Sequence, residues 1–100
     1  ERCVGVFEGL TNDEIAVKYP DLWNKKITRI YNDAPPGGET IKEVELRVSK
    51  GIQKIKNQYS DKNILIVAHA FVGRVIYKIV CGNNCKDVFD TPRLENAQFL

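Results

Sequence analysis

A long amphipathic helix is the clearest element that the sequence predicts. Thr40 and Glu43 stand three positions apart before an apolar run, which is the capping-box pattern of a helix start. The apolar positions that follow recur at steps of three and four, which is the helical period: Ile41, Val44, Val48, Ile52, Ile55 and Tyr59. Residues 32–38 contain two prolines and two glycines, so we expect a loop before this helix.

Shorter helices are expected on both sides of the long one. Thr11 and Glu14 form a second capping-box pattern, and the helix that they begin should end before Pro20. Three further helices are expected at residues 21–31, 73–80 and 84–89. Gly82 is placed where a glycine commonly ends a helix.

Two segments have the pattern of strands. Residues 64–68 read Ile-Leu-Ile-Val-Ala with no polar alternation, which is typical of a parallel strand that is covered on both faces. Residues 96–100 predict a last strand. A sheet of two strands is only marginally stable. We therefore expect the missing neighbours to lie upstream of residue 1 or to come from another chain.

The composition is that of a globular domain. The chain has 100 residues, of which 43% are hydrophobic and 28% charged, so a single domain is expected. The net charge of +2 is too small to indicate nucleic-acid binding, and no apolar run approaches the roughly 20 residues of a membrane span. The three cysteines are an odd number and are expected to be reduced thiols. Because the chain contains no methionine and begins with Glu1, we expect a longer natural protein.

Candidate chemistry gathers around His69, the sole histidine. It follows the strand predicted at residues 64–68, and ligands of open α/β sheets bind beyond the carboxyl ends of strands. The helix that comes next offers backbone N–H groups, which favour anions. From the residues alone, a phosphate or carboxylate site and a purely structural histidine both remain open. Thr40 is most simply a helix cap and Glu39 a favourable charge near a helix start.

Several motifs together resemble the histidine phosphatase superfamily, the family of cofactor-dependent phosphoglycerate mutases and related phosphatases. Residues 1–9, Glu-Arg-Cys-Val-Gly-Val-Phe-Glu-Gly, are similar to a family segment that begins with Glu-Arg. Residues 38–40 resemble the Gly-Glu-Ser/Thr motif before a long helix. Residues 64–69, with Arg74, resemble the strand that carries the second active-site histidine, and residues 94–97 resemble a late asparagine motif.

The resemblance implies an α/β fold of three layers, αβα, as in phosphoglycerate mutases. The fold would be incomplete here, because the first strand and its neighbours have no match in this sequence. Residues 1–100 would then be the C-terminal part of a single histidine phosphatase domain. A cytoplasmic location is expected.

The resemblance also implies roles for four residues. The family transfers a phosphoryl group through a phosphohistidine intermediate, with a small-molecule phosphomonoester as substrate. For this protein we expect no cofactor and no metal. His69 corresponds to the second histidine and Glu1 to the general acid, which makes both catalytic. Arg2 corresponds to a position that contacts substrate in mutases, and the backbone N–H of Ala70 would reach the phosphate.

Departures from the family pattern limit what this chain is expected to do alone. The family's Arg-His-Gly segment, which carries the nucleophile, has no match, so the fragment is expected to be inactive. Residues 70–72 are apolar where mutases place polar groups, which favours a phosphatase. The alternative is a non-catalytic module that binds phosphate or another anion, or a protein partner. An unpaired edge at residues 64–68 would favour a homo-oligomer or strand exchange.

Overall fold

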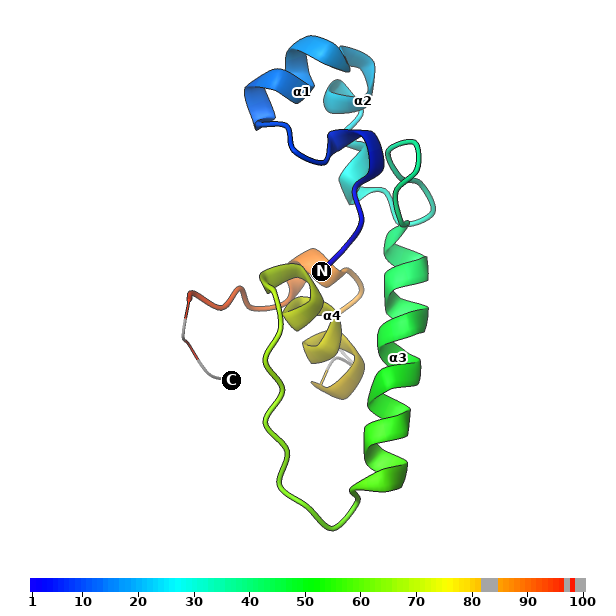
Figure 1. Ribbon diagram of the computed structural model, residues 1–100, viewed down its shortest axis with the longest axis vertical. Coiled ribbons are helices and arrows are strands. Elements are labelled where there is room, and N and C mark those ends of the chain that lie inside the picture. Colours follow the sequence, from blue (N-terminus) through cyan, green and yellow to red (C-terminus); the bar gives the residue numbers. More distant parts are fainter. Residues whose placement is uncertain (82–84, 97, 99–100) are drawn as a thin grey trace. The chain divides into compact units, whose positions relative to one another are not determined.

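A computed structural model describes residues 1–81, 85–96 and 98. These residues divide into two compact units, which we call the N-terminal unit, Arg2–Val44, and the C-terminal unit, Glu1 with Glu45–Leu100. The regular elements of the described residues are all helices, and their order is shown in Figure 1. The expectation of a single domain over residues 1–100 stays a prediction.

The N-terminal unit is built from short helices around a small apolar core. Its four elements are η1 (Gly5–Phe7), α1 (Asn12–Lys18), α2 (Pro20–Asn24) and η2 (Ile27–Arg29). Figure 1 shows α1 and α2 side by side. Phe7, Ile15 and Ile27 form the buried cluster, and the ring of Tyr19 lies 5.7 Å from that of Phe7 between centroids. Each of these elements is short, and each places at least one apolar side chain in the core or packed against it.

The prediction for the start of α1 is confirmed. The Thr11 side chain accepts a hydrogen bond from the Glu14 N–H at 3.2 Å, and the Glu14 carboxylate accepts one from the Thr11 N–H at 2.7 Å. The helix ends at Lys18, before Pro20, and Pro20 then begins α2 as its first residue. Proline fits there because the first N–H of a helix has no partner within the helix.

The single helix predicted at residues 21–31 is wrong. The structure divides it into α2 and η2, and Lys26 between them adopts a left-handed conformation with φ of 53°. This break turns the chain so that Ile27 is buried, with an exposed fraction of 3%. Packing of Ile27 against the core therefore outweighs the local preference for one continuous helix.

The loop expected at residues 32–38 is confirmed, and it approaches the first residues of the chain closely. The Val6 N–H donates to the Pro36 carbonyl at 3.0 Å. Gly5 has φ of 55°, and a Cβ on Gly5 would collide with the Pro36 carbonyl oxygen. Glycine is therefore required at this crossing for two reasons, its backbone conformation and the lack of space.

The long helix is confirmed as α3 (Ile41–Gln58). The Thr40–Glu43 capping box is present, since the Glu43 N–H donates to Thr40 Oγ1 at 3.1 Å and the Thr40 N–H donates to Glu43 Oε2 at 2.8 Å. Four of the predicted apolar positions are buried: Ile41, Val44, Val48 and Ile52. The division between the two units falls within this helix.

The C-terminal unit contains α4 (Ala70–Cys81) and η3 (Val88–Asp90). α4 begins three residues earlier than predicted, because the His69 carbonyl already accepts a hydrogen bond from the Gly73 N–H at 2.8 Å. α4 and η3 contact each other, and the rings of Phe71 and Phe89 lie 6.0 Å apart between centroids. Lys78 of α4 pairs with Glu45 of α3, and both side chains are largely buried.

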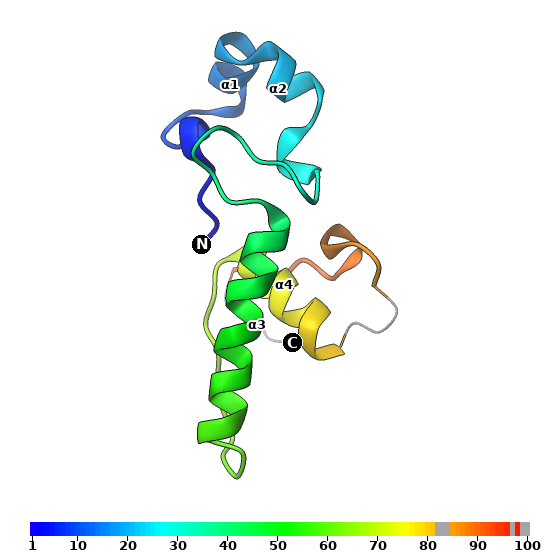
Figure 2. The same ribbon diagram turned by 90° about the vertical axis from the view of Figure 1, so that its right-hand side faces the viewer.

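Residues 64–68 do not form a strand in the described residues. They follow α3 as an extended segment without a partner, drawn without an arrow in Figure 2. Leu65 is 71% exposed and Val67 is 89% exposed. A strand needs neighbouring strands to accept and donate its backbone hydrogen bonds, and the described residues supply none. The three-layer arrangement expected from the sequence is therefore not confirmed.

Some predictions fall on residues outside those that the structure describes. Gly82 as the end of α4 is one, and Asn84 at the start of the helix predicted at residues 84–89 is another. Within the described part, that helix is replaced by η3, which begins at Val88. The last strand predicted at residues 96–100 also lies largely outside the described residues.

Candidate active site

Glu1 and His69 lie in contact within the C-terminal unit. Glu1 Oε2 is 3.1 Å from His69 Nδ1. The imidazole is 72% exposed and the carboxylate 57% exposed, so both side chains are accessible to a ligand. At this distance a carboxyl group can supply a proton while the neighbouring imidazole donates a hydrogen bond to developing negative charge. Phosphoryl transfer uses both functions. The structure thus brings together the two residues that the sequence predicted as catalytic.

His69 owes its position to the start of α4. It precedes Ala70, the first residue of the helix, and its carbonyl accepts the first hydrogen bond of that helix. The first N–H groups of a helix have no partner within the helix and attract negative charge. Ala70 directly follows His69 and is the first residue of α4, so its N–H is one of these groups without a partner within the helix. Its contact with phosphate stays a prediction.

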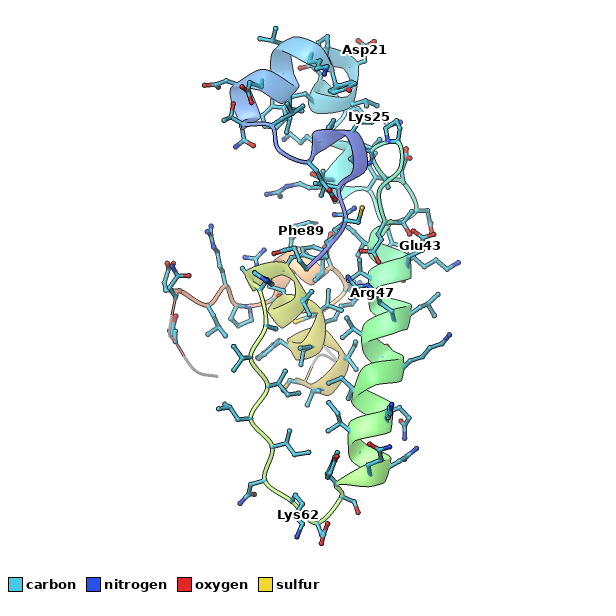
Figure 3. The ribbon with its side chains drawn as sticks, in the orientation of Figure 1. Asp21, Lys25, Glu43, Arg47, Lys62 and Phe89 are labelled. Atoms are coloured by element: carbon cyan, nitrogen blue, oxygen red, sulfur yellow. The ribbon has the colours of Figure 1, made fainter. Side chains whose placement is uncertain are left out.

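Arg47 holds the backbone of Glu1. Its guanidinium lies on α3, where Figure 3 labels it, and Nη2 donates to the Glu1 carbonyl oxygen. Arg47 is one turn after Glu43 in the same helix. A long rigid helix therefore supplies an anchor for the residue that carries the candidate acid.

Arg2 is buried in the N-terminal unit. Its side chain spans from the loop before α3 to η2, since it donates to the Glu39 carbonyl and to the Thr28 carbonyl. The exposed fraction of Arg2 is 7%. Desolvation by burial lowers the pKa of Arg2, and the Glu39 carboxylate opposes this effect. A role of Arg2 in substrate binding stays a prediction.

Glu39 makes contacts that the sequence did not indicate. Its carboxylate accepts a hydrogen bond from the Cys3 N–H at 2.9 Å, and its own N–H donates to the Cys3 carbonyl at 2.9 Å. The sequence suggested only a charge near the start of a helix. The contact joins residues 36 positions apart, and no local pattern reports such a pairing. One signal in the sequence could have pointed to this contact. The Glu-Arg motif at residues 1–2 and the Gly-Glu motif at residues 38–39 both resemble site motifs of one family.

Arg74 packs against an aromatic ring. Its Cζ lies 6.0 Å from the centroid of Phe89, which Figure 3 labels beside α4. A guanidinium near an aromatic face gains a modest cation–π attraction. Arg74 and Phe71 thereby join α4 to η3 and steady the helix that begins after His69.

The described residues contain a cavity of about 620 Å³, which lies within the N-terminal unit. Phe7, Ile15 and Ile27 line it together with Lys26 and Arg29. None of the four site residues predicted from the sequence lines it. The cavity and the Glu1–His69 pair are therefore separate features.

The described residues contain neither a metal-binding cluster nor a helix that could span a membrane. No three side chains among the histidine, cysteine, aspartate and glutamate residues come together as a metal centre would need. None of the helices in the described part of the chain has both the length and the apolar character for crossing a bilayer. Cys3, Cys81 and Cys85 are free thiols.

Comparison with known proteins gives a match over almost the whole chain. The family model of the histidine phosphatase superfamily, branch 1, matches residues 1–99. A protein of Bacillus subtilis named as an uncharacterized phosphatase, PhoE, is 31% identical over 97 residues, which are 97% of this chain and 44% of that protein. No solved structure gives a significant match.

Two further relatives are enzymes with named substrates. Fructose-2,6-bisphosphatase of Saccharomyces cerevisiae is 33% identical over 77 residues, which are 77% of this chain and 16% of that protein. A 2,3-bisphosphoglycerate-dependent phosphoglycerate mutase of Cytophaga hutchinsonii is 38% identical over 71 residues, which are 69% of this chain and 33% of that protein. The chain thus spans less than half the length of each of these relatives.

Proposed function

Because this chain belongs to the histidine phosphatase superfamily, an α/β family that includes phosphatases and phosphoglycerate mutases, we propose that the protein containing it hydrolyses small phosphomonoesters through a phosphohistidine. The observation that carries the proposal is the 3.1 Å contact between Glu1 Oε2 and His69 Nδ1. It joins residues from opposite parts of the sequence, both of which match family site motifs. A cytoplasmic location and the three-layer αβα fold belong to the same proposal.

The first step transfers the phosphoryl group to the enzyme. The histidine of the family's Arg-His-Gly segment attacks phosphorus with a ring nitrogen, and the bond from phosphorus to the leaving oxygen breaks. The Glu1 carboxyl group gives its proton to that oxygen. His69 and the Ala70 N–H donate hydrogen bonds to the phosphoryl oxygens, whose charge is redistributed in the transition state.

The second step releases phosphate. The Glu1 carboxylate now accepts a proton from water, and the water oxygen attacks phosphorus while the bond from phosphorus to histidine nitrogen breaks. The nucleophilic histidine is regenerated, and the proton count balances over the two steps because Glu1 gives one proton and recovers one. One carboxyl group therefore serves as acid and then as base.

We expect no turnover from the 100-residue chain by itself. His69 is its sole histidine and corresponds to the second one of the family, so the chain contains no nucleophile. The apolar residues 70–72 support a phosphatase rather than a mutase, because mutases place polar, substrate-facing groups at these positions.

The proposal is tested by phosphomonoester turnover of the intact protein and of three variants. Glu1→Gln and His69→Ala should each lower kcat by about 100-fold or more, the usual size of a general acid or of a charge-stabilising group. Asp61→Asn removes a carboxylate from an exposed pair with Lys62 in the same unit and is the matched control, with unchanged turnover.

Two results would contradict the proposal. One is turnover that Glu1→Gln and His69→Ala leave unchanged. The other is an intact protein that binds phosphate but hydrolyses no phosphomonoester, which is the behaviour of a non-catalytic anion-binding module.

A further inference from the structure

The Arg2 guanidinium is occupied by the protein's own backbone. Nε and Nη2 donate to the Glu39 carbonyl at 3.1 and 3.0 Å, and Nη1 donates to the Thr28 carbonyl at 2.6 Å. All three nitrogens therefore make hydrogen bonds inside the N-terminal unit. With 7% of its surface exposed, the residue presents little of itself to a dissolved ligand.

Glu39 holds the same segment from its other side. Its carboxylate accepts from the Cys3 N–H and its N–H donates to the Cys3 carbonyl, each at 2.9 Å. Backbone and side chain of Glu39 thus bind both Arg2 and Cys3. We call this set of contacts among Arg2, Cys3, Thr28 and Glu39 the Arg2–Glu39 clasp.

Burying the Arg2 side chain is energetically unfavourable by itself, and its hydrogen bonds offset this cost. Burial of a guanidinium is unfavourable unless its donors are satisfied, and desolvation lowers the pKa of Arg2. An arginine offers five donors in a rigid planar fork, so one side chain can fix two separate backbone segments. Arg2 and Cys3, which these contacts fix, belong to no helix or strand. The clasp supplies the order that regular structure does not supply here.

We infer that Arg2 and Glu39 are positioning residues, which fix the backbone next to Glu1 so that its carboxyl group stays within reach of the leaving oxygen. Arg2 then acts through Glu1 and does not bind substrate. The inference rests on the proposed function, in which Glu1 is the general acid. Only one peptide bond joins Glu1 to Arg2, so the fixed backbone of Arg2 and Cys3 limits where the Glu1 carboxyl group can go.

The choice of substrate separates positioning from binding. A nitrophenyl phosphate has a leaving group that departs as an anion and needs little help from an acid, whereas glycerol phosphate, an alkyl ester, needs a proton on its leaving oxygen. Loss of a positioned acid therefore lowers kcat/KM, which reports the steps up to release of the leaving group, far more for the alkyl ester than for the aryl ester. Loss of a substrate ligand lowers kcat/KM for both esters alike.

The experiment measures kcat/KM of the intact protein and its variants on p-nitrophenyl phosphate and on glycerol phosphate. Arg2→Ala should lower kcat/KM for glycerol phosphate by about 100-fold, the effect of a misplacement of roughly 1 Å. Its kcat/KM for the aryl ester should change by less than about tenfold. An equal loss of kcat/KM for both esters would overturn the inference, because that is the effect of a lost substrate ligand.

Two variants of Glu39 keep the test valid where Arg2→Ala does not fold. Glu39→Ala removes the acceptor of the Cys3 N–H and should lower kcat/KM for glycerol phosphate by about tenfold. Glu39→Gln keeps an acceptor oxygen at the same place and should restore turnover close to wild type. Equal losses in the two Glu39 variants would overturn the inference, because they would mean that the charge of Glu39 matters and its hydrogen bond does not.

The variant Glu1→Gln separates the inference from the proposed function. It should show the same selective loss of kcat/KM on glycerol phosphate as Arg2→Ala. If the wild type hydrolyses neither ester, or if Glu1→Gln lowers kcat/KM for both esters equally, the proposed function fails and the inference fails with it. If Glu1→Gln is selective but Arg2→Ala is not, only the inference fails.

Discussion

At the scale of single residues, side chains that are distant in the sequence bind the backbone of Glu1 and of Cys3. Arg47 donates to the Glu1 carbonyl, and Glu39 accepts from the Cys3 N–H. The sequence predicted Glu1 and His69 as site residues because each stands in a segment that resembles a family motif. It did not predict the hydrogen bonds of Arg47 and Glu39, because a hydrogen bond to a distant main-chain atom leaves no trace in residue type or spacing.

One residue-scale prediction concerns stability and pH. Asp33 accepts hydrogen bonds from Lys25 Nζ and from the Ala34 N–H, both at 2.9 Å, and these contacts lower the pKa of Asp33. A lowered pKa in the folded state means that the carboxylate stabilises the fold above its ordinary pKa and loses this effect as pH falls through the folded-state value.

The variant Asp33→Asn tests this sign. We expect its melting temperature to lie slightly below that of the wild type at neutral pH, because the pair is exposed and its effect is small. The difference should shrink when both proteins are melted at a pH below the folded-state pKa of Asp33. A difference that grows on acidification would contradict the assignment.

At the scale of elements, the helices with a capping box are the ones that the sequence predicts well. α1 and α3 both begin where Thr11 and Thr40 indicate. The segment at residues 21–31 has no such boundary, and its break at Lys26 depends on the burial of Ile27 in a core that comes from other segments. The local sequence pattern thus predicts where α1 and α3 begin, whereas tertiary packing decides where α2 ends.

The cap of α3 gives an element-scale prediction. Thr40→Ala removes the hydroxyl that accepts from the Glu43 N–H, and should lower the free energy of unfolding by about 1 kcal/mol. Thr40→Ser keeps a hydroxyl and should stay within a few tenths of the wild type. Urea unfolding of the two variants measures the difference, and equal losses in both would contradict a role for the hydroxyl.

At the scale of the whole molecule, the residues that the structure describes form helices and no strand, whereas the family to which the chain belongs has an α/β fold. The strand pattern at residues 64–68 is strong, yet the segment stays extended and exposed in the described residues. The relatives are more than twice as long as the part that this chain matches. Pattern alone predicts that a segment prefers a strand, but the partners decide whether a sheet forms. Homo-oligomerisation through this segment stays a prediction.

The central claim is that Glu1 and His69 serve a phosphohistidine reaction whose nucleophile is another histidine. The most direct test mixes the intact Glu1→Gln variant with radiolabelled p-nitrophenyl phosphate and quenches the mixture in base. Without its carboxylate the variant should form the phosphoenzyme but should hydrolyse the phosphoenzyme slowly. Acid-labile label should therefore accumulate on a histidine of the intact protein other than His69. Label on His69, or no labelled protein at all, would contradict the account.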